Sequence, residues 1–559
     1  MLFMKLSSLN TIAFTKATFG FYVLFAIHIP ISHIGGSGLY LPFNVLSWIF
    51  VSLIIGLGSW QIYKSRKLYF SSFILQSWIG FAFLILPLSY GNNDHSNFTF
   101  FRIIGLGLGI LLLISYHQFR FKKNDIYDFL YMFLGLLFIQ SLFILYQQFA
   151  PDLSFSLIQS IAHFGPFAQK NIFATYLSTG LIISFVLLII DENAWSIGWK
   201  RFLVHSIPLI TMSHYLFLHS RTGYLSIILS MSLIILINYQ KLKRAKIWFT
   251  LAFVGLLFSF ISQQESRPTN AIEYSKNSRE TTYLLTLELI RENPAIGIGY
   301  GKFLKSFREH YAKRKSTDPN IQLLGNNNMD HPHNEILFWT VEGGIIPLLG
   351  ILFIIGSFLN IIWKAKKKIA WSHLVLLLPI TIHLQLELPF YISAIHWFTF
   401  IFLIFIVDSE HGKEYMIAIN IPELFRVFSI MFPLIVCTYM LTTLQTMSLM
   451  TKYERSGYKE PFLLASGLNF HALQKKYETL VMKLNLETGK RTKDENKIKA
   501  YILWAENFIE HSPYLFIYYD LATAYEAIND RKTGWEIYNY AKYLYPGAKW
   551  RDENNVNID

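Results

Sequence analysis

Residues 172–190 read IFATYLSTGLIISFVLLII, a run of 19 residues without a charged side chain. A helix of about 20 apolar residues is long enough to cross the hydrocarbon core of a bilayer. Twelve further apolar runs lie at 11–30, 43–62, 69–90, 99–118, 127–149, 203–219, 223–239, 247–262, 335–362, 372–390, 396–408 and 425–447. The sequence therefore predicts an all-α fold, a polytopic membrane helical bundle of about 12–13 transmembrane helices.

The composition supports this class. The chain of 559 residues is 53% hydrophobic and 15% charged, whereas soluble proteins are about 45–50% apolar and about 25% charged. A single cysteine, Cys437, excludes a disulfide scaffold. The net charge of +13 lies mostly among the apolar runs, because the chain from Met450 onward holds 16 basic and 15 acidic residues. Positive charge in such places sets membrane topology, which argues against a nucleic-acid partner.

Lys and Arg are divided unevenly between the short connections that alternate along the chain. One set holds twenty of them, from Lys5 to Arg426, and the other holds two, Lys170 and Arg221. Because cytoplasmic connections carry the excess of positive charge, the first set is predicted to be cytoplasmic. In a bacterium the chain is then a multi-pass protein of the inner (cytoplasmic) membrane, with the loop 263–334 and its C-terminal part in the periplasm.

These patterns predict four regions. They are N-terminal transmembrane helices at 1–262, a periplasmic loop with interfacial helices at 263–334, C-terminal transmembrane helices at 335–449 and a soluble periplasmic helical domain at 450–559. In the last region Pro513 and Pro546 end comparable helices 33 residues apart, near the tetratricopeptide period. A small domain that packs on itself or on the loop is as well supported as a tetratricopeptide-like domain that binds proteins.

The two cations of the external connections are candidates for function, because a cation on the translocated side opposes the topology signal. Lys170 and Asn171 end the segment GPFAQKN, and Arg221 lies in the turn SRTG. Each long side chain could simply extend to lipid headgroups. The alternative is an anion site at the outer face of the membrane.

The external loop holds a second set of candidates. The segment GIGYG at 297–301 precedes a basic amphipathic stretch, and a glycine-rich loop before a helix can hold phosphate. These glycines follow a helix rather than a strand, which excludes a dinucleotide fold and favours a tight turn between two interfacial helices.

The loop ends in DHPHNE, which contains His331 and His333. Neutral imidazole can take a proton from a hydroxyl nucleophile, so a general base is the preferred role. A zinc site lacks a third ligand at clear spacing, and a polar cap on the next helix is the remaining alternative. Asn334 and Glu342 follow and are expected to support the site.

A further pair, His383 and Glu387, lies four residues apart in an apolar run and hence on one helical face. Such groups must face protein or water rather than acyl chains. They either orient another site residue or join helices.

Four motifs occur in order along the chain: GPFAQKNIFATYL, SRTGYL, NPAIGIGYGKF and HPHNEILFWTVEGG. They resemble motifs of the bacterial O-antigen ligase/polymerase superfamily, and most closely its O-linking protein oligosaccharyltransferases (PglL-like). GLYLPFN near the N-terminus and the later ELPF and HW are similar to that branch too. The resemblance extends over residues 1–450 and more weakly beyond.

The resemblance implies O-linked protein glycosylation by a glycosyltransferase without cofactor or metal. An oligosaccharide would pass en bloc from an undecaprenyl pyrophosphate carrier to Ser or Thr of a periplasmic or pilin-like protein. His333 matches the essential loop histidine, with His331 as a competing assignment. Arg221 and Asn171 match donor-binding positions, and Lys170 is their neighbour. Fixed cations would stabilise the charge that develops on the leaving pyrophosphate.

Two alternatives lie within the same superfamily, a lipopolysaccharide O-antigen ligase and an O-antigen polymerase. A third, of another class, is a multispan transporter or flippase. A transporter should show internal repeats with broken helices at the membrane midplane, and the sequence has no such pairwise symmetry. The expected partners are the lipid-linked glycan, an acceptor protein and membrane lipids.

Overall fold

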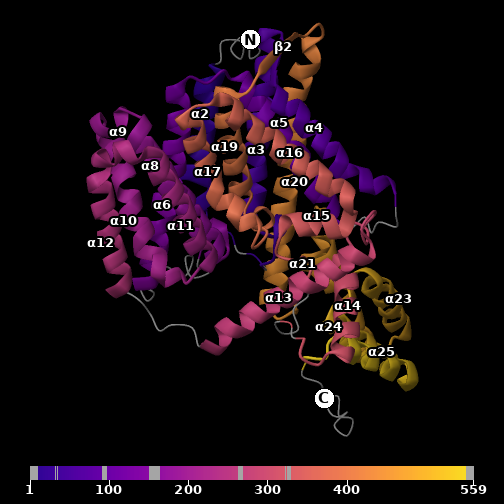
Figure 1. The fold of residues 1–559 in the computed structure, drawn as a ribbon. Helices are drawn as coiled ribbons and strands as arrows, with labels where there is room; N and C mark the ends of the chain where they lie inside the picture. The colour runs from indigo at the N-terminus through magenta and orange to yellow at the C-terminus, as the bar shows by residue number, and fades with distance from the viewer. Residues whose placement is uncertain are drawn as a thin grey trace. The chain divides into compact units, whose positions relative to one another are not determined.

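The structure is a computed structural model that describes residues 10–29, 31, 33, 35–90, 97–149, 164–261, 269–321, 323 and 329–548. Within these ranges it consists of α-helices, short 3-10 helices and one two-stranded sheet (Figure 1). The predicted all-α membrane bundle is thereby confirmed. Outside the described residues lie Lys5, most of the connections 91–98 and 150–171, the start of the loop 263–334 and the end of the region 450–559.

Ten stretches of the described chain are long and apolar enough to cross a membrane. They are Thr11–His28, Pro42–Ser65, Ser72–Ser89, Thr99–Gln118, Lys123–Gln147, Lys170–Ile190, Arg221–Phe260, Ile345–Ala365, Ala394–His411 and Pro422–Arg455. The seventh stretch contains two helices, α11 (Arg221–Asn238) and α12 (Lys246–Ile261). Two more predicted runs are occupied by α10 (Gly198–Leu218) and α17 (Lys368–Leu384). The helices thus describe a multi-pass membrane protein.

One predicted run, 335–362, is two helices rather than one. α15 (Glu335–Gly343) ends before α16 (Ile345–Ala365) begins. Between them Gly344 has φ 75°, a left-handed conformation that glycine adopts at little cost. Hydropathy alone does not detect this break, because both helices are apolar.

A second predicted run, 372–390, also ends early. α17 stops at Leu384, and Pro389 begins the short helix α18 (Pro389–Ile392). Proline is favoured at the first position of a helix, where its missing N–H is not needed. The residues between the two helices, Glu387 among them, are therefore not part of a membrane helix.

The described chain forms two compact units. Unit 1 consists of described residues from Met1–Ile79, Ile104–Ser266 and Leu352–Leu473. Its central helix is α8 (Lys170–Ile190), whose side chains from Ile172 to Ile189 are all buried. α6 (Lys123–Phe149), α10, α11 and α17 pack around α8 (Figure 1). α8 is therefore covered by protein on every side rather than by lipid.

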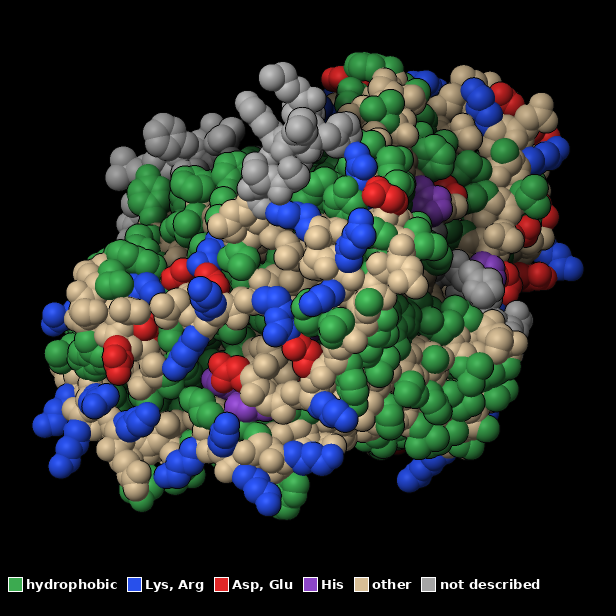
Figure 2. All heavy atoms as spheres, turned by 90° about the horizontal axis from the view of Figure 1, so that it is seen from above, with side chains coloured by type: hydrophobic (Ala, Val, Ile, Leu, Met, Phe, Trp, Pro, Cys, Tyr) green, Lys and Arg blue, Asp and Glu red, His purple; other side chains and the backbone are tan. Residues whose placement is uncertain are grey.

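Some of the connections of unit 1 that are rich in Lys and Arg are held by a two-stranded sheet, and others by ion pairs. β1 (Lys67–Ser71) pairs antiparallel with β2 (Glu414–Ala418), a sheet that hydropathy did not predict. Lys16 lies 2.5 Å from Asp125 and 2.8 Å from Asp128. Figure 2, viewed from the side on which β2 lies in Figure 1, shows Lys and Arg side chains gathered on this face.

Unit 2 consists of described residues from Gly80–Ile103, Arg267–Ile351 and Gln474–Asp559. In it α13 (Thr269–Glu292) packs against α14 (Phe303–Thr317) and α15. The C-terminal helices are α22 (Gln474–Thr492), α23 (Glu495–His511), α24 (Leu515–Ala527) and α25 (Arg531–Leu544). Each of these packs on the next, and α23 and α25 also pack on α14.

The link between α14 and the C-terminal helices is polar and aromatic. Lys305 Nζ lies 2.7 Å from Glu510 Oε2, and this ion pair lowers the pKa of the Glu510 carboxyl. The guanidinium of Arg308 stacks 4.2 Å from the ring centre of Tyr545. Burial of Arg308 lowers its pKa. α14 and the C-terminal helices therefore belong to one compact unit.

We expect Gly344→Ala to lower the free energy of unfolding by about 3 kcal/mol, because it adds both backbone strain and overlap. A Cβ on Gly344 would lie 2.3 Å from the carbonyl oxygen of Ala295. Gly457 is the matched control, since its φ is 66° but no described atom lies within 4 Å of its added Cβ. Gly457→Ala should cost only about 1 kcal/mol. Thermal unfolding in detergent at one heating rate measures both, and equal shifts would contradict the close packing at Gly344.

Candidate functional site

The first turns of α8 and α11 lie against each other in unit 1. A Cβ added to Gly223, in the first turn of α11, would lie 2.7 Å from the Cβ of Ala174 in α8. Only glycine permits this approach of the two helices. Lys170 is the first residue of α8 and Arg221 the first residue of α11. The structure therefore brings Lys170, Asn171 and Arg221 together at one end of unit 1.

These two helix ends concentrate positive charge. The N-terminus of a helix carries about half a positive charge, and a cation placed there is unfavourable by about 0.3–1 kcal/mol. Neither first turn contains an acidic residue. The Ser220 side chain accepts the Gly223 N–H at 3.2 Å and so fixes the start of α11. Helix N-termini bind anions, so two such ends beside each other suit an anionic ligand.

The end of α17 is bound to the same turn of α8 through Thr175. The hydroxyl of Thr175 lies 3.1 Å from the carbonyl oxygen of Asn171 and 2.7 Å from Nδ1 of His383. His383 is fully buried, and its carbonyl oxygen accepts the N–H of Glu387 at 2.9 Å. His383 is thus placed to position the first turn of α8, and Glu387 follows it by one turn.

Exposure distinguishes these residues. Arg221 is exposed, Lys170 and Asn171 are half-buried, and His383 and Glu387 are buried. The cations are therefore within reach of a ligand. The two helix N-termini add backbone N–H groups that can bind phosphate oxygens. Chemically, the arrangement suits a phosphate or pyrophosphate group.

The two loop histidines lie together in unit 2, immediately before α15. Their ring centres are 4.6 Å apart, and the N–H of His333 donates to Nδ1 of His331 at 3.2 Å. His333 has φ 56°, a left-handed conformation rare for a residue with a side chain. Tyr283 donates to the carbonyl oxygen of His333 at 3.3 Å. Backbone strain of this kind is often found at functional sites.

The hydrogen bond between the histidines distinguishes their roles. Because Nδ1 of His331 accepts a hydrogen bond from the His333 N–H, neutral His331 must carry its own hydrogen on Nε2. In this tautomer it has no remaining lone pair with which to act as a base. Asn334 caps α15 by accepting the Leu337 N–H at 2.9 Å. The geometry therefore favours His333 over His331 as the proton acceptor.

Glu342 holds the glycine-rich turn of unit 2. One of its carboxylate oxygens lies 2.6 Å from an Nη atom of Arg102, and the other accepts the Gly301 N–H at 3.0 Å. Arg102 also stacks on Trp339 and Phe338, at 4.1 and 4.5 Å from the ring centres. Both charged side chains are buried, and their charges offset each other.

The N–H groups of the glycine-rich turn are bonded within the protein. Gly297 donates to Asn293, Ile298 to Val341 and Gly299 to Glu342, at 2.9–3.0 Å. Gly301 donates to the Glu342 carboxylate, as described above. A phosphate would have to displace these bonds, so the tight-turn interpretation is favoured over phosphate binding.

Two residues that bind candidate site residues were not recognised in the sequence. They are Thr175, which bonds to His383, and Arg102, which pairs with Glu342. Thr175 carries no signal of its own, because its role depends on a helix 208 residues away. Arg102 lies within the apolar run 99–118. An ionisable residue in such a run is itself a sign of a buried partner or a site.

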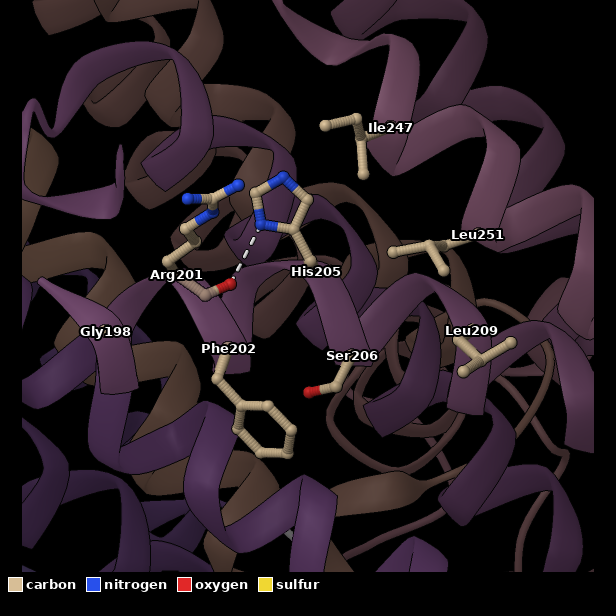
Figure 3. Close-up of a pocket in the computed structure, with 8 residues that line it drawn as sticks. All are labelled: Gly198, Arg201, Phe202, His205, Ser206, Leu209, Ile247 and Leu251. Carbon is tan, nitrogen blue, oxygen red and sulfur yellow. Dashed lines mark hydrogen bonds between the residues drawn. The ribbon is translucent and has the colours of Figure 1, made fainter. Parts of the chain in front are cut away.

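A groove on unit 1 lies apart from these residues (Figure 3). It is lined by Gly198, Arg201, Phe202, His205, Ser206, Leu209, Ile247 and Leu251, from α10 and α12. Nδ1 of His205 bonds to the carbonyl oxygen of Arg201 at 2.8 Å. Along α10, Arg201 is about 25 Å from the end that leads to Arg221. The groove and the cluster of cations are therefore separate features.

Two family models match the chain. One, described as O-antigen ligase, matches residues 207–352, which include Arg221, His331 and His333. The other, described as the C-terminal part of a virulence factor membrane-bound polymerase, matches residues 371–556. None of the curated proteins matches. Together the two matches cover more than half of the chain, in the order of its helices. The chain belongs to the O-antigen ligase/polymerase superfamily, whose membrane proteins use lipid-linked glycan donors.

Proposed function

We propose that this protein is an O-linking oligosaccharyltransferase. It moves an oligosaccharide en bloc from undecaprenyl pyrophosphate to a Ser or Thr hydroxyl of a periplasmic or pilin-like protein. The observation that carries the proposal is the meeting of Lys170 and Arg221 at the adjoining ends of α8 and α11. The unequal distribution of Lys and Arg supports a periplasmic location for this end, in the inner membrane of a bacterium.

The donor side of the reaction needs fixed positive charge. When the bond between the anomeric carbon and the phosphate oxygen breaks, its electron pair stays on the pyrophosphate. Lys170, Arg221 and the two helix N-termini neutralise the charge that develops there. Asn171 adds an amide, and His383 positions this turn through Thr175. Pyrophosphate leaves readily, so the reaction does not require a paired carboxylate.

The acceptor side needs a base. The attacking hydroxyl forms the new bond to the anomeric carbon and gives its proton to the imidazole of His333. His331 holds the backbone of His333, and Asn334 fixes the start of the next helix. Both histidines belong to the unit that contains the C-terminal helices. An acceptor that binds those helices is thereby held in the same unit as the base.

The C-terminal helices offer a surface that suits a protein acceptor. Trp535, Tyr540 and Tyr543 of α25 are each 38–45% exposed. The Trp535 ring also stacks on Tyr538, with ring centres 5.4 Å apart. Exposed Tyr and Trp residues are enriched where proteins bind one another. Stacked helix pairs commonly present such binding surfaces.

The polymerase alternative has a specific observation in its favour, the printed description of the match at 371–556. An enzyme that joins two lipid-linked glycans must hold two pyrophosphates, whereas transfer to a protein requires one. Among the described residues of unit 1, the external connections contribute one pair of cations, at one place. A single donor site fits transfer to a protein or to lipopolysaccharide better than polymerisation.

The proposed function is tested by intact-mass analysis of periplasmic proteins and pilins from strains with and without the gene. We expect at least one of these proteins to lose the mass of a whole oligosaccharide when the gene is deleted. A lipopolysaccharide gel of the same strains is the control for the ligase and polymerase alternatives. Unchanged protein masses beside altered lipopolysaccharide would reject the protein acceptor.

We expect His333→Ala to lower the transfer rate by about 100-fold or more, the usual contribution of a general base. His331→Ala should be less severe, because it loosens the backbone of His333 without removing the base. In vitro transfer, normalised to the amount of folded protein in the membrane, measures both. If His333→Ala only lowers the amount of protein, the histidine acts as a helix cap.

Arg221→Lys distinguishes pyrophosphate binding from extension to lipid headgroups. A guanidinium can bond two phosphate oxygens at once, whereas an ammonium is a point charge. If Arg221 binds the donor, its replacement by Lys should cost about tenfold in kcat/KM for the lipid-linked donor, or about 1.4 kcal/mol. Arg221→Ala should be worse, and KM for the acceptor should stay the same.

The matched control is Arg201→Lys, an arginine at the other end of α10 that lines the separate groove. It should leave donor kinetics unchanged. An Arg221→Lys variant with the donor kinetics of the unmodified protein would reject the pyrophosphate role.

A further inference from the structure

Two histidines and a glutamate meet in unit 1, on the helices that flank α18. His373 lies in the second turn of α17, and Glu410 and His411 end α19 (Ala394–His411). Nδ1 of His373 is 3.5 Å and Nε2 of His411 is 4.0 Å from Oε2 of Glu410. The three ligand atoms all lie within 4.8 Å of one another. None of these residues has a role in the proposed transfer reaction.

Both imidazole nitrogens that face this cluster are buried without a hydrogen bond. The His373 side chain is 3% exposed and that of His411 is 4% exposed. Among the described residues, neither Nδ1 of His373 nor Nε2 of His411 has a hydrogen-bond partner. A buried polar atom without a partner is destabilising by about 1–3 kcal/mol. Two such atoms directed at one carboxylate indicate a ligand that all three share.

The spacing suits a divalent metal ion. In a tetrahedral site with bonds of about 2.0–2.1 Å, two ligand atoms are about 3.3–3.4 Å apart. The His373–Glu410 separation of 3.5 Å is close to this value, and the His411–Glu410 separation of 4.0 Å requires only a small rotation. Two imidazoles and one carboxylate are a common ligand set for zinc and related ions, with water in the fourth position.

Two lysines near the cluster could take the place of a metal ion as partners of the Glu410 carboxylate. The ammonium groups of Lys123 and Lys367 are within electrostatic range of the Glu410 carboxylate. They could pair with Glu410 or donate to an imidazole lone pair, but among the described residues neither Nδ1 of His373 nor Nε2 of His411 accepts such a bond. The Glu410 side chain is 31% exposed, which provides an open side for a water ligand and for entry of the ion.

We propose that His373, Glu410 and His411 bind a divalent cation of the zinc class, which clamps the start of α17 to the end of α19. The clamp lies beside β2, which begins three residues after His411. The opposite end of α17 carries His383, which bonds to α8. The ion therefore fixes the helix that positions the proposed donor site, from the end remote from it.

The test uses the full-length protein in detergent, without a polyhistidine tag and stripped of metal by a chelator. His331→Ala and His333→Ala are introduced together as background, so that the other histidine pair cannot bind metal. The protein is titrated with Co²⁺, whose visible absorption reports tetrahedral coordination, and then with Zn²⁺. We expect one ion per chain. Zn²⁺ should also raise the midpoint of thermal unfolding.

In the same background, His373→Gln, Glu410→Gln and His411→Gln should each weaken binding at least about tenfold, since even loss of an outer-shell group costs about 10–100-fold. The matched control is His205→Gln, because His205 is another buried histidine whose Nε2 has no hydrogen-bond partner among the described residues. It should bind the ion as the background protein does. Glu410→Gln keeps side-chain volume at a partly exposed position, so it should stay folded. Absence of Co²⁺ absorption in the background protein, or equal binding by all four variants, would overturn the proposal.

Discussion

Inside a bilayer, backbone N–H and C=O groups have no water to bind, and this constraint confines the membrane part of the chain to helices. Polar chemistry is then possible mainly where helices begin and end. Lys170 and Arg221 are first residues of α8 and α11, and His383 lies in the last turn of α17. The close contact of Gly223 with Ala174 brings the two helix ends together, so that their dipoles add at one place.

In unit 2 two turns of the backbone pass close to each other, and a buried ion pair holds them in place. The turn between α13 and α14 must pass close to the break between α15 and α16, where a Cβ on Gly297 would lie 2.4 Å from the carbonyl oxygen of Glu342. The buried pair of Arg102 and Glu342 locks this crossing, with aromatic rings around the guanidinium. A buried pair is weak evidence for stability by itself, but removal of one partner leaves the other charge uncompensated. The same bonds occupy the glycine N–H groups, which is why a motif that resembles a phosphate loop is here a structural turn.

Hydropathy predicted α8 at 172–190, and the helix extends from Lys170 to Ile190, because an uncharged run of this length has no other stable conformation in lipid. Charge asymmetry marked Lys170 and Arg221 without any structural information. Breaks that depend on a single dihedral, such as the one at Gly344, leave no mark in hydropathy. Partners distant in sequence leave none either. Thr175 and His383 are bonded only because α8 and α17 pack, and the β1–β2 ladder forms only because two connections meet. The bond from the His333 N–H to His331 likewise depends on a local backbone conformation that the sequence does not report.

The carboxylates near the candidate residues bear on the mechanism. Enzymes that cleave a bond between two sugars use a carboxylic acid to protonate the leaving oxygen and a second carboxylate on the other side. In unit 2 the conspicuous carboxylate is Glu342, and both of its oxygens are engaged within the unit, one by Arg102 and the other by the Gly301 N–H. In unit 1 the candidate residues at the ends of α8 and α11 are cations and an amide, and the candidate carboxylate Glu387 is buried one turn beyond His383. The cations can stabilise the negative charge of a good leaving group, whereas a poor leaving group would need an acid. This composition favours a donor whose leaving group departs without protonation by an acid. Pyrophosphate is such a leaving group.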